Sequence, residues 1–283
     1  IFELISKIKN KKNKEFSDIK SICVGNIYLG GTGKTPLTIK LYEILSKLNH
    51  KVATVKKNYS SQKDEQLLLK KKTNLIIASS RKIAIQKGLK QNLDFLIFDD
   101  GLQEMRIGYN NSFVCFKSKN WIGNGQLIPA GPMREKISSL KRFDAVFLNG
   151  YSKNLEKIEN QIYKINPKIK IFRTLYEIAN IKNLNLNLKY LIFSGIGNPS
   201  DFREILLEKK FNIEKEMIFP DHYKYSYNDF KKILDKAKKE NLEILTTEKD
   251  FMKIPEEFKD KIKFLSIDVI IKNQNELIEL IKK

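Results

Sequence analysis

The chain has 283 residues, of which 41% are hydrophobic and 10% aromatic, so it can bury a large core. Its 53 lysines and arginines exceed its 33 aspartates and glutamates by 20. That charge suits phosphates, nucleic acid or an anionic membrane surface, but it also fits an AT-rich genome that uses Lys, Asn and Ile everywhere. No apolar run approaches the roughly 18 residues that cross a bilayer, which argues against a membrane-spanning protein.

The first segment has a helical apolar pattern. Ile1, Leu4, Ile5 and Ile8 fall on one helical face, and lysines at positions 7, 9, 11, 12 and 14 lie nearby. We expect an amphipathic helix here, which either rests on a membrane interface or packs on the protein's own core.

Short apolar runs then alternate with helical patterns. Strands are predicted at residues 21–27, 51–55, 75–78, 94–98, 113–116 and 145–148, with helices at about 34–48 and at 83–88. Cys23 and Cys115 fall inside two of these runs without metal-ligand spacing, so we expect plain packing in a reducing compartment. The alternation is typical of an α/β protein with a doubly wound, mainly parallel sheet.

A second βα series begins near residue 190. A strand at 190–193, a turn at 195–197, a helix at 199–209 and a strand at 243–245 are predicted. We therefore expect two α/β domains. The first, residues 1–175, begins with the amphipathic helix, and the second, residues 176–283, is smaller.

A glycine-rich loop separates the first predicted strand from the first long helix. It consists of Gly30, Gly31, Thr32, Gly33, Lys34 and Thr35. Glycines let successive backbone N–H groups face a phosphate at the positive end of a helix dipole. Lys34 would bridge the β- and γ-phosphates of ATP and the Thr35 hydroxyl would bind Mg²⁺, although the first glycine of the usual P-loop pattern is replaced by Tyr28. The loop predicts a P-loop NTPase.

Two aspartates end a later apolar strand. Asp99 and Asp100 follow the run Phe95-Leu96-Ile97-Phe98. Carboxylates at this position commonly hold the metal, or its water shell, beside a phosphate loop. We expect Thr35, Asp99 and Asp100 to form the magnesium site, and the sequence leaves open which aspartate touches the metal.

Four segments point to one family. They are Val24-Gly25-Asn26 ahead of the loop, Asp99-Asp100-Gly101-Leu102-Gln103, the stretch GNGQLIPAGPMRE at residues 123–135, and TTEKD at residues 246–250. In this order they resemble the tetraacyldisaccharide 4′-kinase family over about residues 20–255. The resemblance implies an ATP- and Mg²⁺-dependent kinase that phosphorylates the 4′-hydroxyl of the lipid A disaccharide 1-phosphate.

The resemblance also implies roles for less obvious residues. The segment from Lys63 to Leu69 is similar to the family segment whose aspartate is the general base, which implies Asp64. Phe219-Pro220-Asp221-His222-Tyr223 is similar to the segment whose histidine pairs with that base, which implies His222. Arg134 matches a family arginine that would stabilise the transferring phosphoryl group, and Gln103 would line the nucleotide site. Glu104 stands where the family often has histidine.

The resemblance implies a peripheral location on the cytoplasmic face of the bacterial inner membrane, with the anionic membrane surface as a partner. We expect neither a nucleic-acid ligand nor an obligate protein partner. A partition ATPase also carries a GGTGKT loop, but it normally has lysine directly before the two glycines, where this chain has Leu29. A kinase acting on a soluble sugar or nucleoside is the other alternative, and it would not need the amphipathic start.

Overall fold

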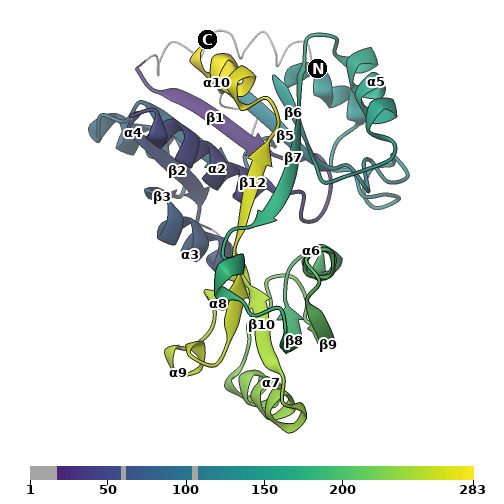
Figure 1. Cartoon of the computed structure of the whole chain (residues 1–283). Helices are drawn as coiled ribbons and strands as arrows, with labels where there is room; N and C mark the ends of the chain where they lie inside the picture. The colour runs from purple at the N-terminus through teal and green to yellow at the C-terminus, as the bar shows by residue number, and fades with distance from the viewer. Residues whose placement is uncertain (1–17, 59–61, 104–107) are drawn as a thin grey trace. The chain divides into compact units, whose positions relative to one another are not determined.

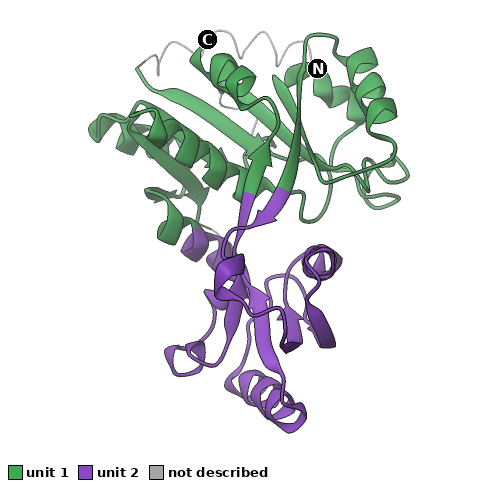
Figure 2. Ribbon diagram, in the orientation of Figure 1, with its two compact units in different colours: residues 1–58, 69–175, 269–283 green, residues 59–68, 176–268 purple. Residues whose placement is uncertain are grey.

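The computed structural model describes residues 18–58, 62–103 and 108–283 (Figure 1). The amphipathic helix expected within residues 1–14, and Glu104, lie outside these described residues. The chain forms two compact units (Figure 2). Unit 1 comprises residues 1–58, 69–175 and 269–283, and unit 2 comprises residues 59–68 and 176–268.

Unit 1 is built on a sheet that has eight strands within the described residues, in the order β12-β7-β6-β5-β1-β4-β2-β3. Every neighbouring pair from β7 to β3 is parallel. Parallel strands buried on both faces read as continuous apolar runs, which is the pattern of the sequence. The strands are β1 (Lys20–Gly25), β2 (Val52–Lys57), β3 (Leu75–Ala78), β4 (Phe95–Asp99), β5 (Asn111–Lys117), β6 (Ala145–Asn149), β7 (Lys170–Ile178) and β12 (Ile267–Ile271).

Helices pack on this sheet through apolar faces. In α2 (Lys34–Lys47), Leu37, Leu41, Ile44 and Leu45 are buried at helical spacing, and the helix contacts β1, β2 and β4. The other helices with residues in this unit are α3 (Lys63–Lys72), α4 (Arg81–Lys90), the 3₁₀ helix η3 (Ile137–Arg142), α5 (Leu155–Ile165) and α10 (Gln274–Lys282). Cys23 and Cys115 are buried free thiols in β1 and β5, as predicted, and burial raises the pKa of Cys23 to about 12.

Unit 2 has a four-stranded parallel sheet in the order β11-β10-β8-β9. Along β8, Tyr190 and Ile192 belong to one apolar cluster, whereas Leu191 and Phe193 belong to another, because successive side chains point to opposite faces. Its elements are η4 (Ile181–Asn183), β8 (Lys189–Ser194), α6 (Pro199–Glu208), β9 (Asn212–Ile218), α7 (Tyr227–Glu240), β10 (Glu243–Thr247), α8 (Glu248–Phe251), α9 (Glu256–Lys259) and β11 (Lys263–Leu265).

The division of the chain differs from the expected one. The chain passes from unit 1 to unit 2 after residue 175, but residues 269–283 return to unit 1, because β12 joins the large sheet beside β7. Residues 59–68 belong to unit 2 although they lie inside the predicted first domain. Neither domain is therefore a continuous stretch of sequence, and Asp64 is a residue of unit 2.

Candidate active site

The predicted phosphate loop connects the end of β1 to the start of α2. Gly30 and Gly33 have φ angles of 94° and 91°, a left-handed conformation that favours glycine. A Cβ added at Gly30 or Gly31 would meet no atom within 4 Å, so the backbone of the loop is open to a ligand. Gly33 caps α2 without a side chain, so no side-chain cap competes for the N–H groups of the first turn.

Polar side chains hold this loop from inside unit 1. The buried Asn26 donates through Nδ2 to the Gly30 carbonyl (3.2 Å) and to the Thr32 hydroxyl (3.0 Å). Gln103 in turn donates through Nε2 to the Asn26 carbonyl at 2.7 Å. In this arrangement Gln103, which the sequence analysis placed in the nucleotide site, supports the residue that shapes the loop.

Asp99 contacts the last residue of the loop, Thr35. Its Oδ2 accepts hydrogen bonds from the Thr35 hydroxyl (3.0 Å) and from the Lys56 ammonium (2.8 Å), and its Oδ1 accepts from the Thr38 hydroxyl (3.4 Å). Thr35 and Asp99 offer the hard oxygen donors that Mg²⁺ prefers. Among the described residues, no group of three His, Cys, Asp or Glu side chains could hold a metal by itself. A magnesium ion here would take its other ligands from phosphate oxygens and water.

Asp100 has a different environment from Asp99. Its carboxylate lies 4.0 Å from Lys34 Nζ and 3.7 Å from Arg134 Nη1. The Arg134 backbone N–H donates to the Ile27 carbonyl at 2.8 Å, which ties the GNGQLIPAGPMRE segment to the chain just after β1. Unit 1 therefore brings Lys34, Thr35, Asp99, Asp100 and Arg134 to the phosphate loop.

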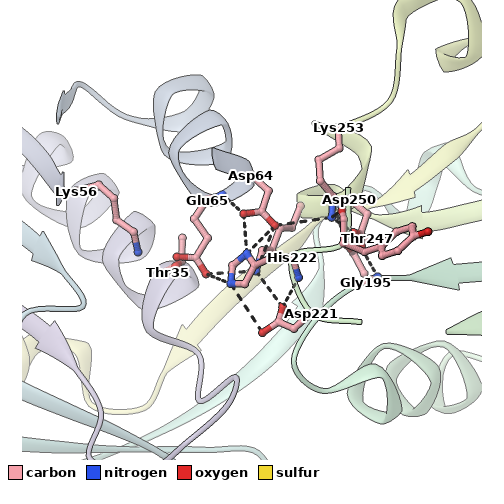
Figure 3. A network of polar contacts seen from close by, with 12 residues as sticks. Thr35, Lys56, Asp64, Glu65, Gly195, Asp221, His222, Thr247, Asp250 and Lys253 are labelled. Atoms are coloured by element: carbon pink, nitrogen blue, oxygen red, sulfur yellow. Dashed lines mark hydrogen bonds and ion pairs between the residues drawn. The ribbon is translucent and has the colours of Figure 1, made fainter. Parts of the chain in front are cut away.

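Asp64 and His222 are paired within unit 2. His222 Nδ1 lies 2.9 and 3.0 Å from the two carboxylate oxygens of Asp64, so Nδ1 carries the proton that it donates to them (Figure 3). Asp64 lies in the first turn of α3, where the helix dipole favours an anion, and its Oδ1 also accepts from the Glu65 N–H. The His222 side chain is 23% exposed and that of Asp64 is 2% exposed.

Two lysines complete the surroundings of Asp64. Its Oδ2 lies 3.6 Å from Lys249 Nζ and 3.8 Å from Lys253 Nζ. Burial alone raises the pKa of the Asp64 carboxyl, but the hydrogen bond from His222 and the charges of both lysines outweigh burial and leave that pKa below its ordinary value. The carboxylate is consequently ionised at neutral pH.

Lys249 also holds the neighbouring acids together. Its Nζ lies 3.3 Å from Glu65 and 3.6 Å from Asp221, and these residues appear around His222 in Figure 3. Burial lowers the pKa of Lys249, but the carboxylates of Glu65, Asp64 and Asp221 more than compensate, so the pKa lies above its ordinary value and the ammonium stays charged.

Asp250 anchors this network in the core of unit 2. The fully buried carboxylate lies 2.6 Å from Lys253 Nζ and accepts hydrogen bonds from the Gly195 N–H (2.9 Å), the Thr247 hydroxyl (2.8 Å) and the Tyr225 hydroxyl (3.1 Å). Lys253 thus connects Asp250 to Asp64. It is fixed further by the Tyr223 carbonyl at 3.1 Å.

Comparison with known proteins identifies the family. The sequence model of the family "Tetraacyldisaccharide-1-P 4′-kinase" matches residues 1–283. The chain belongs to the tetraacyldisaccharide 4′-kinase family. It is 44% identical to the tetraacyldisaccharide 4′-kinase of Pelagibacter ubique, over 100% of this chain and 91% of that protein. It is 34% identical to the corresponding kinase of Wigglesworthia glossinidia brevipalpis, over 89% of this chain and 72% of that protein.

A solved member of this kinase family has the same fold. The structure of LpxK from Aquifex aeolicus in complex with ATP superimposes with a TM-score of 0.68 at 22% sequence identity, and the match covers 99% of this chain and 96% of that one. The predicted P-loop α/β fold is therefore confirmed. A partition ATPase is excluded, because the kinase family accounts for the whole chain.

The predicted site residues fall into two groups, one in each unit. Lys34, Thr35, Asp99, Asp100 and Arg134 are gathered in unit 1, and Asp64 and His222 in unit 2. Three lysines that neutralise these carboxylates carry no sequence signal that pointed to the site: Lys56, Lys249 and Lys253. Lys249 lies in the TTEKD segment that carried the family resemblance, but no role was inferred for it. Within the described residues, no helix has the length and apolar character that a membrane crossing needs.

Proposed function

We propose that this chain transfers the γ-phosphate of ATP to the 4′-hydroxyl of tetraacyldisaccharide 1-phosphate. The observation that carries the proposal is the pairing of a buried carboxylate, Asp64, with His222 Nδ1, in a chain that also forms a phosphate loop. A phosphate loop alone is common to switches, transporters and kinases. A carboxylate that is held in place as a general base accounts for transfer to a hydroxyl group, which nucleotide binding alone would not need.

The phosphate half of the reaction is assigned to unit 1. The loop backbone from Gly30 to Gly33 holds the β- and γ-phosphates, and Lys34 places its charge on them. Arg134, 3.7 Å from Asp100, adds a second cation that spreads the charge on the transferring phosphoryl group. Asp100 orients both cations, and Gln103 keeps the loop in shape through Asn26.

Magnesium suits the oxygen donors beside the loop. The Thr35 hydroxyl and the Asp99 carboxylate would hold the ion, or its water shell. When bound, it would neutralise charge on the β- and γ-phosphates. The Thr38 hydroxyl and the Lys56 ammonium fix the orientation of Asp99.

The acceptor half of the reaction is assigned to unit 2. Asp64 is ionised at neutral pH and accepts the proton of the 4′-hydroxyl as that oxygen forms its bond to the γ-phosphorus, while the bond from the γ-phosphorus to the ADP oxygen breaks. His222 orients the carboxylate. His222 is the more exposed of the two side chains. Lys249 and Lys253 keep the pair charged and in place.

The lipid nature of the acceptor supports action at an anionic membrane surface. A net charge of +20 favours such a surface, with each nearby lysine or arginine contributing about 1 kcal/mol. We propose peripheral binding to the cytoplasmic face of the inner membrane. Deleting residues 1–14 should weaken binding to anionic vesicles, and unchanged binding would assign that segment another role.

Transfer of labelled phosphate tests the reaction. The purified protein is incubated with Mg²⁺, γ-labelled ATP and tetraacyldisaccharide 1-phosphate in detergent micelles, and the position of the new phosphate is read from the isolated lipid. Asp64→Ala is assayed in parallel, with Asp235→Ala, a change on the exposed face of α7, as the matched control. We expect a 4′-phosphorylated lipid from the unchanged protein and the control alone.

Other outcomes identify the alternatives. ATP binding with no lipid product, but with transfer to a deacylated disaccharide, would indicate a kinase for soluble sugars. ATP binding without transfer to either acceptor would indicate a nucleotide switch. Full activity of Asp64→Ala would leave the kinase reaction intact and reject Asp64 as the base.

A further inference from the structure

Lys56 is a buried cation at the carboxyl end of β2. Its side chain is 1% exposed, and Nζ lies 2.8 Å from Oδ2 of Asp99, whose side chain is fully buried. In the parallel pairing of β2 with β4, Val55 lies opposite Phe98, so the next residues, Lys56 and Asp99, follow side by side. The strand register therefore brings an ammonium group against the carboxylate that faces the phosphate loop.

The Lys56 ammonium and the phosphate loop share one oxygen atom. Asp99 Oδ2 accepts from Lys56 Nζ and also from the Thr35 hydroxyl at 3.0 Å. Both Thr35 and Lys56 are labelled in Figure 3. The two groups proposed to hold magnesium, Thr35 and Asp99, are thus already bonded to each other and neutralised by a lysine.

The local charges determine when a divalent cation can bind there. A buried carboxylate is costly unless a positive partner compensates it, and Lys56 provides such a partner. A magnesium ion on Asp99 would lie a few ångströms from the ammonium, where little water screens the repulsion between them. Negative charge from a nucleotide phosphate would offset that repulsion.

We propose that Lys56 makes magnesium binding at Asp99 conditional on nucleotide. The free protein does not take up Mg²⁺ at this carboxylate, and the metal enters together with the phosphates of ATP. This inference rests on the proposed function, because it concerns the metal that accompanies ATP there. It assigns Lys56 as a positioning residue that acts through Asp99.

Thermal unfolding with Mg²⁺ alone tests the inference without any turnover. Lys56→Met leaves Asp99 buried with its lysine removed, so in EDTA its melting temperature should fall by roughly 10 °C. Millimolar MgCl₂ without nucleotide should recover about half of that loss, because the ion replaces the missing positive charge. The unchanged protein should respond to MgCl₂ by less than about 1 °C, and should be stabilised by MgATP.

Two matched variants separate charge balance from simple damage. Lys82→Met removes one lysine from the exposed surface of α4 and should show no Mg²⁺ response. The double variant Lys56→Met/Asp99→Asn removes both buried charges, and should melt above Lys56→Met in EDTA while losing the response to MgCl₂. Calorimetric titration of MgCl₂ should give at least about tenfold tighter binding to Lys56→Met than to the unchanged protein.

Other results would contradict the proposed role of Lys56. An equal loss of melting temperature in EDTA and in MgCl₂ would make the pair purely structural. Stabilisation of the unchanged protein by MgCl₂ alone would show that its metal binding needs no nucleotide. If Lys56→Met does not fold, Lys56→Gln, which keeps an N–H donor without the charge, decides by the same measurements. Failure of MgATP to stabilise the unchanged protein would instead reject the proposed nucleotide site.

Discussion

Asp99 in unit 1 and Asp64 in unit 2 are both buried carboxylates with positively charged partners, but their partners differ in kind. Asp99 accepts from two hydroxyl groups and one ammonium, all on elements of the large sheet domain. Asp64 is paired with an imidazole 158 residues away, and with two lysines. Hydroxyls beside a carboxylate form a set of hard oxygen ligands, whereas an imidazole beside a carboxylate forms a pair that can share a proton.

The surroundings of these two aspartates suit the same side chain to two different roles. Asp99 needs a fixed orientation beside a phosphate loop, and strand register supplies it. As the proposed base, Asp64 needs an ionised state and access to a hydroxyl. The hydrogen bond from His222 and the charges of two lysines outweigh burial and keep it ionised, and the half-buried His222 lies beside it. We therefore expect substitutions at the two sites to separate metal–nucleotide binding from proton transfer.

The largest effects should come from Asp64→Asn and Asp99→Asn. Each should lower phosphoryl transfer by about 10³-fold or more, since one removes the proposed general base and the other the proposed metal ligand. Only Asp99→Asn should weaken the binding of MgATP, measured by calorimetry, because Asp64 lies in the other group of residues. Asp64→Asn should bind MgATP within about twofold of the unchanged protein.

If Asp64→Asn loses as much MgATP affinity as Asp99→Asn, the two carboxylates do not have separate roles. Asp235→Asn, a change of the same type on the exposed face of α7, controls for altered net charge. It should leave both the rate and the affinity unchanged.

The next effect concerns the buried anchor of unit 2. Asp250→Ala removes the acceptor of the buried Gly195 N–H and the nearest carboxylate partner of Lys253. We expect a loss of about 3–5 kcal/mol in the free energy of unfolding, with a drop of roughly 10 °C in melting temperature. Asp235→Ala should stay within about 0.5 kcal/mol of the unchanged protein. Equal melting temperatures for Asp250→Ala and the unchanged protein would show that Asp250 does not anchor the network.

The sequence predicts much more of unit 1 than of unit 2. The loop between a strand and a helix is a local signal, so Gly30 to Thr35 could be placed from sequence alone, and the apolar runs of β1, β4 and β5 come from strands buried in a parallel sheet. β9 was missed because its residues are largely exposed or half-buried, so it has no apolar run. α7 was missed although Phe230, Ile233 and Ala237 recur at helical spacing.

Side chains that act through long-range partners carry little local signal. Lys56 is the penultimate residue of the strand VATVKK, where a lysine normally marks the exposed end of a strand. Only the pairing with β4 reveals Asp99 beside it. The pairing of Asp64 with His222 could be expected only from the family resemblance, because 158 residues separate them. The return of β12 to the large sheet was likewise missed, since an apolar run does not specify its neighbouring strand.

A smaller effect on kcat/KM is expected from substitution of Lys249, and it tests the role of Asp64 as the base. In Lys249→Met one of the charges that lower the pKa of Asp64 is lost, so that pKa rises. Because the base is active only when ionised, activity is lost as pH falls through this pKa, and the acid limb of the kcat/KM profile should move to higher pH. On that limb, kcat/KM should fall by about fivefold, on the scale of ~1 kcal/mol for one partly exposed charge pair.

The groups facing Asp64 make this prediction specific. His222 and Lys253 remain and favour the ionised form, while Glu65 and Asp221 lose their lysine and oppose it. Lys249→Arg keeps the charge and should therefore keep the acid limb at its original pH. A structural role of Lys249 would not make the position of that limb depend on charge. A pH profile of Lys249→Met that keeps its shape while falling uniformly would assign Lys249 to structure. Lys236→Met, on the exposed face of α7, is the charge control.

The smallest effect tests whether the stability of unit 2 is separable from its chemistry. Ser226 caps α7 by accepting from the Asp229 N–H at 3.2 Å, and the Asp229 carboxylate accepts from the Ser226 N–H at 2.8 Å. Ser226→Ala should cost about 1 kcal/mol of unfolding free energy, or about 2–4 °C in melting temperature, while Ser226→Asn should cost only a few tenths. The kcat of both variants should equal that of the unchanged protein, because the contacts among Asp64, His222 and the lysines do not involve the cap. A loss of kcat in Ser226→Ala that Ser226→Asn restores would show instead that the start of α7 helps to hold His222 in place.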